Sequence, residues 1–158
     1  MIRSILIADD EEPNRVVLCE TFARKGYRVV AVSNGIEAIE YVRTRPTTLG
    51  ILDHDMPGMG GLDVLREMRH SHVSIPILIV TSSTDQRLRE KAIAEGAQGF
   101  FSKPVDVGRI RAAVADLIGE ETSIVVRTIG TEITVTFSSN RSNGAGEGPH
   151  GPTPRRRR

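Results

Sequence analysis

The chain has 158 residues, a length that fits one ordinary domain with an appendage better than two full domains. Its composition, with 39% apolar and 26% charged residues and a net charge of +1, allows a core of normal size. It shows neither an apolar run of the about 18 residues that a membrane span needs nor a signal-peptide pattern, so we expect a cytoplasmic protein without membrane contact. The single cysteine, Cys19, excludes an internal disulfide framework and a multi-cysteine zinc site.

Short apolar runs alternate with helix-like segments from Arg3 to about Ile118. The apolar runs predict strands at 4–8, 28–32, 49–52, 75–80 and 98–102. Apolar residues at helical spacing predict helices from Pro13 to the stop at Gly26, over 36–43, around 62–68, and over 85–95 and 106–118. This alternation predicts an α/β fold of the doubly wound kind, in which helices cover both faces of a parallel sheet.

A different pattern begins after Gly119. The segments 124–129 and 131–137 are rich in β-branched residues, and Gly130 can turn the chain between them. We therefore expect a β-hairpin within 120–138. Because an isolated hairpin is marginal in water, it needs a partner, either its own domain or a second chain, and we favour an arm of a homodimer.

The last segment, 139–158, is rich in Asn, Gly, Pro and Ser and ends in four arginines. This composition predicts a disordered basic tail, while the rest of the chain is slightly acidic. The arginines offer charge to an acidic partner, but no aromatic residues are interleaved with them. We therefore do not expect nucleic-acid binding, and we keep it as an alternative.

Polar residues follow four of the predicted strands. Asp9 and Asp10 follow the first, Asp53 the third, Thr81 the fourth and Lys103 the fifth. Parallel strands bring their carboxyl ends to one edge of the sheet, where such folds bind ligands. Separate helix capping is the simpler interpretation of each aspartate, but three crowded carboxylates repel and favour a hard cation such as Mg²⁺. A carboxylate at this edge can attack phosphorus, and Asp53 is the best candidate for the nucleophile. The ammonium of Lys103 and the hydroxyl of Thr81 can then contact the phosphoryl oxygens.

The sequence around these residues resembles the receiver domain of the two-component response regulators. Four motifs carry the resemblance in the order and spacing of that family, namely ILIADDE at 5–11, LDHDMPGM at 52–59, ILIVTS at 77–82 and GAQGFFSKP at 96–104. The resemblance implies a flavodoxin-like fold with strand order 2-1-3-4-5 and a receiver domain over 1–119.

The resemblance also implies a role for each acidic residue. Asp53 is the implied phosphoacceptor. Asp9, Asp10 and Asp53 are implied to hold Mg²⁺ together with the backbone carbonyl of Asp55.

Further roles are implied for the residues that follow the fourth and fifth strands. Lys103 is implied to pair with the phosphoryl group, and Thr81 to move toward it while Phe100 turns inward as the aromatic switch. Ser83 is expected to affect the dephosphorylation rate, and the peptide bond before Pro104 is implied to be cis.

Some residues depart from the family pattern. Gly60 replaces the usual aspartate, which we expect to loosen the loop, and Phe100 lacks the hydroxyl of the more usual tyrosine. Asp55 adds a carboxylate that either hinders a hydrolytic water or is simply solvated. We interpret His54 as a loop residue rather than a ligand or phosphodonor.

The expected function is a phosphorylation-dependent switch that receives its phosphoryl group from a sensor histidine kinase or a histidine phosphotransfer protein. It would catalyse its own phosphorylation and dephosphorylation and signal by protein contact or phosphorelay. A haloacid-dehalogenase-like phosphatase is the enzyme alternative, since Asp53 and Asp55 fit its Asp-x-Asp motif. In that family, however, the acidic pair comes last rather than first.

Overall fold

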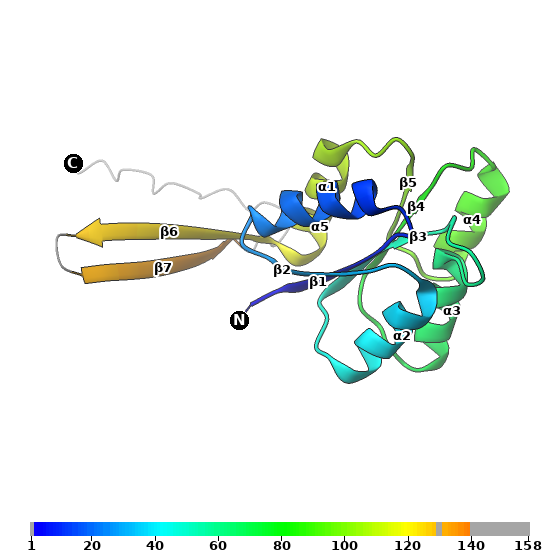
Figure 1. Cartoon of the computed structure of the whole chain (residues 1–158), viewed down its shortest axis with the longest axis horizontal. Coiled ribbons are helices and arrows are strands. Elements are labelled where there is room, and N and C mark those ends of the chain that lie inside the picture. The colour runs from blue at the N-terminus through cyan, green and yellow to red at the C-terminus, as the bar shows by residue number, and fades with distance from the viewer. Residues whose placement is uncertain (1, 129–130, 140–158) are drawn as a thin grey trace, which may run out of the picture.

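The computed structural model describes residues 2–128 and 131–139. Five strands and five helices alternate along the first part of the chain (Figure 1), in the order β1 (Ser4–Ala8), α1 (Glu12–Ala23), β2 (Arg28–Val32), α2 (Gly35–Thr44), β3 (Leu49–Asp53), α3 (Gly61–His70), β4 (Ile77–Thr81), α4 (Gln86–Ala94), β5 (Gly99–Ser102) and α5 (Val107–Ile118). No helix among the described residues is long and apolar enough to cross a membrane.

The five strands form one parallel sheet in the order β2-β1-β3-β4-β5, which confirms the predicted doubly wound fold. Residues of β1, β3 and β4 are buried throughout, because helices cover both faces of these strands. Leu6 contributes to the core beneath α2, α3 and α4, whereas its neighbours Ile5 and Ile7 contribute to the core beneath α1 and α5. The strand period of two thus divides the apolar residues between two cores.

Two strand ends differ from the sequence-based boundaries in a way that matters for the site. Asp53 and Thr81 are the last residues of β3 and β4, whereas the apolar pattern ends one residue earlier in each strand. Asp53 pairs in register with Val80, and Thr81 with Ser102. Pairing within the sheet therefore fixes the main chain of both polar residues.

The predicted hairpin is present as a separate antiparallel sheet of β6 (Glu120–Thr128) and β7 (Thr131–Ser139), drawn to one side of the main sheet in Figure 1. Both strands are longer than the β-branched runs indicated. Gly119 joins α5 to β6 with a positive φ of 77°, and its carbonyl accepts a hydrogen bond from the hydroxyl of Tyr27 at 2.6 Å. The predicted turn at Gly130 and the predicted basic tail beyond Ser139 lie outside the described residues.

The start of α3 packs directly against the end of β3 because two glycines lack side chains there. A Cβ at Gly61 would lie 2.9 Å from the carbonyl oxygen of Asp53 and 3.1 Å from that of Leu52. A Cβ at Gly60 would collide with the carbonyl oxygen of His54. The missing side chain of Gly60 thus permits a close approach of two backbone segments, while its expected loosening of the loop stays a prediction.

Replacement of Gly61 by alanine tests this contact. We expect Gly61→Ala to lower the free energy of unfolding by about 1–3 kcal/mol, since the new Cβ must displace the backbone that carries Asp53. Urea denaturation measures the change. The control is Gly108→Ala on the exposed side of α5, where the new Cβ would meet only the side-chain oxygen of Asp106 at 3.3 Å, so the change in either direction should stay below about 1 kcal/mol. Equal effects at the two positions would contradict a special constraint at Gly61.

Candidate functional site

The carboxyl ends of four strands bring five polar residues to one edge of the sheet. Asp9 and Asp10 follow β1, Asp53 ends β3, Thr81 ends β4 and Lys103 follows β5. Three of these side chains are buried, with exposed fractions of 3% for Asp9, 1% for Asp53 and 0% for Thr81. Polar groups are seldom buried without partners, so their placement calls for a chemical reason.

The three aspartates form a compact acidic cluster. Asp9, Asp10 and Asp53 each offer one carboxylate oxygen, and these atoms lie within 4.8 Å of one another. Asp10 is exposed, which leaves the cluster open to solvent on one side. An oxygen-only donor set with access to water fits a hard divalent cation better than a thiophilic one.

The charge of the cluster is only partly balanced by Lys103. Its Nζ lies 3.0 Å from Oδ2 of Asp53, 3.5 Å from Oδ2 of Asp9 and 4.0 Å from Oε1 of Glu11. Burial lowers the pKa of the Lys103 ammonium, but these acidic neighbours outweigh burial and leave the pKa raised, so the ammonium stays charged. The peptide bond between Lys103 and Pro104 is cis, as the resemblance implied.

The pKa of the Asp53 carboxyl is raised to about 6, and burial is the largest cause. The charge of Asp9 also raises this pKa, whereas the backbone N–H of Asp55, which donates to Oδ1 of Asp53 at 2.9 Å, and the contact with Lys103 lower it. The N–H contact places the main chain of Asp55 beside Asp53. That the carbonyl of Asp55 is a metal ligand stays a prediction.

The side chain of Asp55 is held by the end of β4. Its Oδ1 accepts a hydrogen bond from Oγ1 of Thr81 at 2.8 Å, and its Oδ2 accepts from N and Oγ of Ser82 at 2.7 and 2.8 Å. Burial raises the pKa of the Asp55 carboxyl, but the bonds from Ser82 and Thr81 and the charge of Lys103 outweigh burial, so the pKa is lowered. The sequence reasoning missed these contacts, since no motif relates residues 26 positions apart.

The remaining predicted site residues lie around this edge. Ser83 donates its backbone N–H to Oγ1 of Thr81 at 3.1 Å, which places it next to the site. Phe100 is partly buried against the core beneath α2, α3 and α4, and the guanidinium carbon of Arg89 lies 5.9 Å from its ring centre. Nδ1 of His54 faces the backbone N–H of Leu62 at 3.5 Å, which fits its interpretation as a loop residue.

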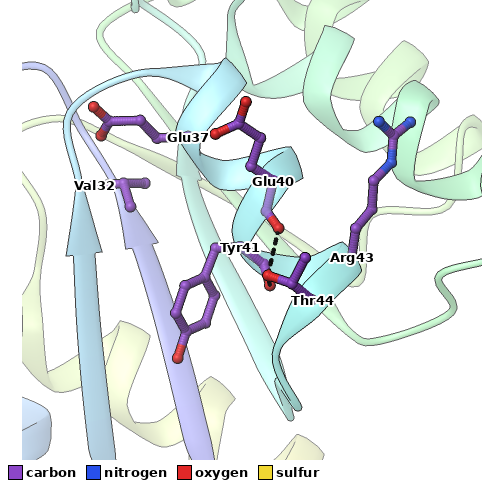
Figure 2. Close-up of a pocket in the computed structure, with 6 residues that line it drawn as sticks. All are labelled: Val32, Glu37, Glu40, Tyr41, Arg43 and Thr44. Atoms are coloured by element: carbon purple, nitrogen blue, oxygen red, sulfur yellow. Dashed lines mark hydrogen bonds between the residues drawn. The ribbon is translucent and has the colours of Figure 1, made fainter.

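A hollow of about 510 Å³ lies elsewhere, between α2 and the end of β2 (Figure 2). Its lining consists of Val32, Glu37, Glu40, Tyr41, Arg43 and Thr44. None of the carboxylates at the edge of the sheet belongs to it, and Oγ1 of Thr44 donates to the backbone carbonyl of Glu40 as in an ordinary helix end. We therefore place the candidate site at the acidic cluster.

Comparison with known proteins agrees with this geometry. The family model described as the response regulator receiver domain matches residues 5–115. The chain belongs to the response regulator receiver domain family. Sporulation initiation phosphotransferase F of Bacillus subtilis is 33% identical over 114 residues, which cover 72% of this chain and 92% of that protein. This membership disfavours the phosphatase alternative.

Other relatives are longer than this receiver domain. The alkaline phosphatase synthesis transcriptional regulatory protein PhoP of Bacillus subtilis is 29% identical over 118 residues, which cover 75% of this chain but only 49% of that protein. A response regulator receiver protein from Pseudomonas putida has a solved structure with a TM-score of 0.69 and 28% identity, covering 72% of this chain and 96% of that one. The likeness is thus confined to the receiver domain.

The raised pKa of Asp53 gives a prediction for the pH dependence of stability. The folded protein holds this proton more tightly than the unfolded chain, whose pKa is near 3.8, so the stabilisation is complete below about pH 4 and is lost as the pH rises through about 6. In a chelator, Asp53→Asn should therefore gain on the wild type by on the order of 1 kcal/mol between about pH 4 and pH 7, with the nearby ammonium of Lys103 limiting the gain.

Urea denaturation at several pH values measures this difference. Asp63→Asn on α3 is the control, because it makes the same exchange at an exposed residue outside the acidic cluster. A difference between the wild type and Asp53→Asn that does not vary with pH would contradict the prediction.

Proposed function

We propose that this receiver domain is a phosphorylation-dependent switch that accepts a phosphoryl group on Asp53 from a histidine of a sensor kinase or a phosphotransfer protein. The observation that carries the proposal is the burial of the Asp53 carboxylate beside Asp9, with the ammonium of Lys103 3.0 Å away. A carboxylate in this setting is a nucleophile whose environment already offers a positive charge to an incoming anion.

A carboxylate oxygen of Asp53 attacks phosphorus, the P–N bond to the donor imidazole breaks, and the imidazole leaves with a proton from solvent. Lys103 offsets the charge of the phosphoryl oxygens, and the hydroxyl of Thr81 donates a hydrogen bond to one of them. Attack of water on the same phosphorus returns Asp53 and releases inorganic phosphate.

Mg²⁺ belongs to this proposal as the cofactor. Asp9, Asp10 and Asp53 are the side chains that would hold it, since their oxygens already converge. When bound, the ion supplies positive charge to the phosphoryl oxygens. The fit rests on the all-oxygen donor set and on the excess of carboxylates over the one ammonium at the cluster.

Two relatives support a place in a phosphorelay. One is named a phosphotransferase, and the sensor protein EvgS of Escherichia coli is 32% identical over 114 residues, which make up 10% of that protein.

We further propose a receiver domain over 1–119, a hairpin over 120–138 and a separate tail over 139–158, in a cytoplasmic protein.

Labelling tests the assignment of the phosphoacceptor. With a small phosphodonor or a cognate kinase, Asp53→Asn should lose essentially all label, whereas the exposed Asp63→Asn control should keep it. Chelation of Mg²⁺ should also abolish labelling of the wild type. Undiminished label in Asp53→Asn would refute the assignment, and turnover of a generic phosphate ester would favour the phosphatase alternative.

We also propose that the hairpin is a dimer arm. The support is that β6 and β7 pair only with each other among the described residues, so each strand has a second edge for another chain. Light scattering should then give a dimer for the full chain and a monomer for a version ending at Gly119, with and without Mg²⁺ and beryllofluoride. Monomers in every condition would contradict the arm.

A further inference from the structure

The Asp55 side chain bridges the ends of β3 and β4. All three of its side-chain hydrogen bonds go to Thr81 and Ser82, while its backbone N–H donates to Asp53. We propose that Asp55 is a positioning residue whose carboxylate holds the Thr81 hydroxyl and the following loop away from the phosphoryl position, so that it sets the free-energy cost of the switch. This proposal rests on the proposed function of Asp53.

The hydroxyl of Thr81 can serve only one acceptor at a time. It has a single hydrogen, which it donates to Oδ1 of Asp55 at 2.8 Å, and its oxygen accepts from the backbone N–H of Ser83 at 3.1 Å. Donation to a phosphoryl oxygen therefore requires that the bond to Asp55 break. A hydrogen bond to a carboxylate is stronger than one to a neutral acceptor, so the competition is costly.

The second oxygen of Asp55 extends this restraint to the loop. Oδ2 accepts from both N and Oγ of Ser82, at 2.7 and 2.8 Å, so the residue after Thr81 is held by the same carboxylate. A movement of the loop after β4 must therefore break these bonds, whereas a rotation of the Thr81 side chain breaks only the bond to Oδ1. Because Thr81 is fully buried and Ser82 is exposed, water screens the bond between Asp55 and Thr81 less than the bonds between Asp55 and Ser82.

The ammonium at the site does not relieve this competition. The described ion pairs of Lys103 join it to Asp9, Glu11 and Asp53. The Asp55 carboxylate instead receives its three short contacts from neutral donors of β4 and the next residue. The phosphoryl group on Asp53 is thus the second anion that competes with the Asp55 carboxylate for the Thr81 hydroxyl.

The test is the affinity of the full chain for beryllofluoride with Mg²⁺, measured by titration calorimetry. We expect Asp55→Ala to bind this phosphoryl mimic roughly 5- to 20-fold more tightly, which is near the low end for a hydrogen bond to a charged group because the Asp55 residue is exposed. Ser82→Ala removes one bond to Oδ2 but keeps every charge and the Thr81 hydroxyl. It should shift the affinity in the same direction by a smaller factor, about 2- to 5-fold.

A double-mutant cycle separates the clamp from simple repulsion between anions. Asp55→Ala should give no gain in a Thr81→Ala background, because the hydroxyl for which the anions compete is gone. A gain that persists in that background would overturn the clamp and assign the effect to charge. Unchanged or weaker binding by both Asp55→Ala and Ser82→Ala would also overturn it. Should Asp55→Ala fail to fold, Ser82→Ala decides alone.

The same titration separates this inference from the function on which it rests. A wild-type chain that does not bind beryllofluoride with Mg²⁺ contradicts the phosphoacceptor site itself. A wild-type chain that binds, with variants that do not differ from it, contradicts only the role of Asp55.

Discussion

The burial of the Asp53 carboxylate beside Asp9 is the constraint on which the rest of this domain depends. Two buried carboxylates at one strand edge repel, and burial adds to the cost of their charge, as the pKa of about 6 for Asp53 reflects. The partly buried ammonium of Lys103, the residue after β5, balances part of that charge. The remainder makes the edge a place where a cation is favoured, and where a bound phosphoryl group needs positive charge around it.

The sheet supplies the rigidity that such a site requires. Asp53 and Thr81 sit inside the strand pairing rather than in loops, and the start of α3 closes on the carbonyl of Asp53 where Gly61 has no side chain. Their main chains are therefore fixed, and the freedom of the site lies in side chains and in the loop after β4. Asp55 connects these two parts, because its main chain touches the acceptor and its carboxylate touches the residue that must move. In the switch that we propose, phosphorylation of Asp53 is a competition between two anions for one hydroxyl.

The strand order was implied by the family resemblance, whereas the meeting of Asp9, Asp10 and Asp53 follows from the sequence itself for a simple reason. Parallel strands end at the same edge, so polar residues after successive apolar runs must converge there. The close approach of Gly60 to the carbonyl of His54 was not predicted, because the sequence does not show which backbone lies opposite a loop glycine. The position of the Asp55 carboxylate was also left open between two interpretations. It depends on the register of β3 against β4, which the apolar pattern does not specify.

The sequence by itself therefore determined the fold class, the family resemblance and the identity of the acidic cluster, because these depend on periodicity and on residues next to strand ends. The tertiary structure decided which donors each carboxylate receives. It placed the Lys103 ammonium within ion-pair distance of Asp53 and Asp9. It also brought the Asp55 carboxylate within hydrogen-bond distance of Thr81 and Ser82. The physical reason is that hydrogen bonds act over about 3 Å, and distances of that order between separate strands are fixed only when the sheet is paired and packed.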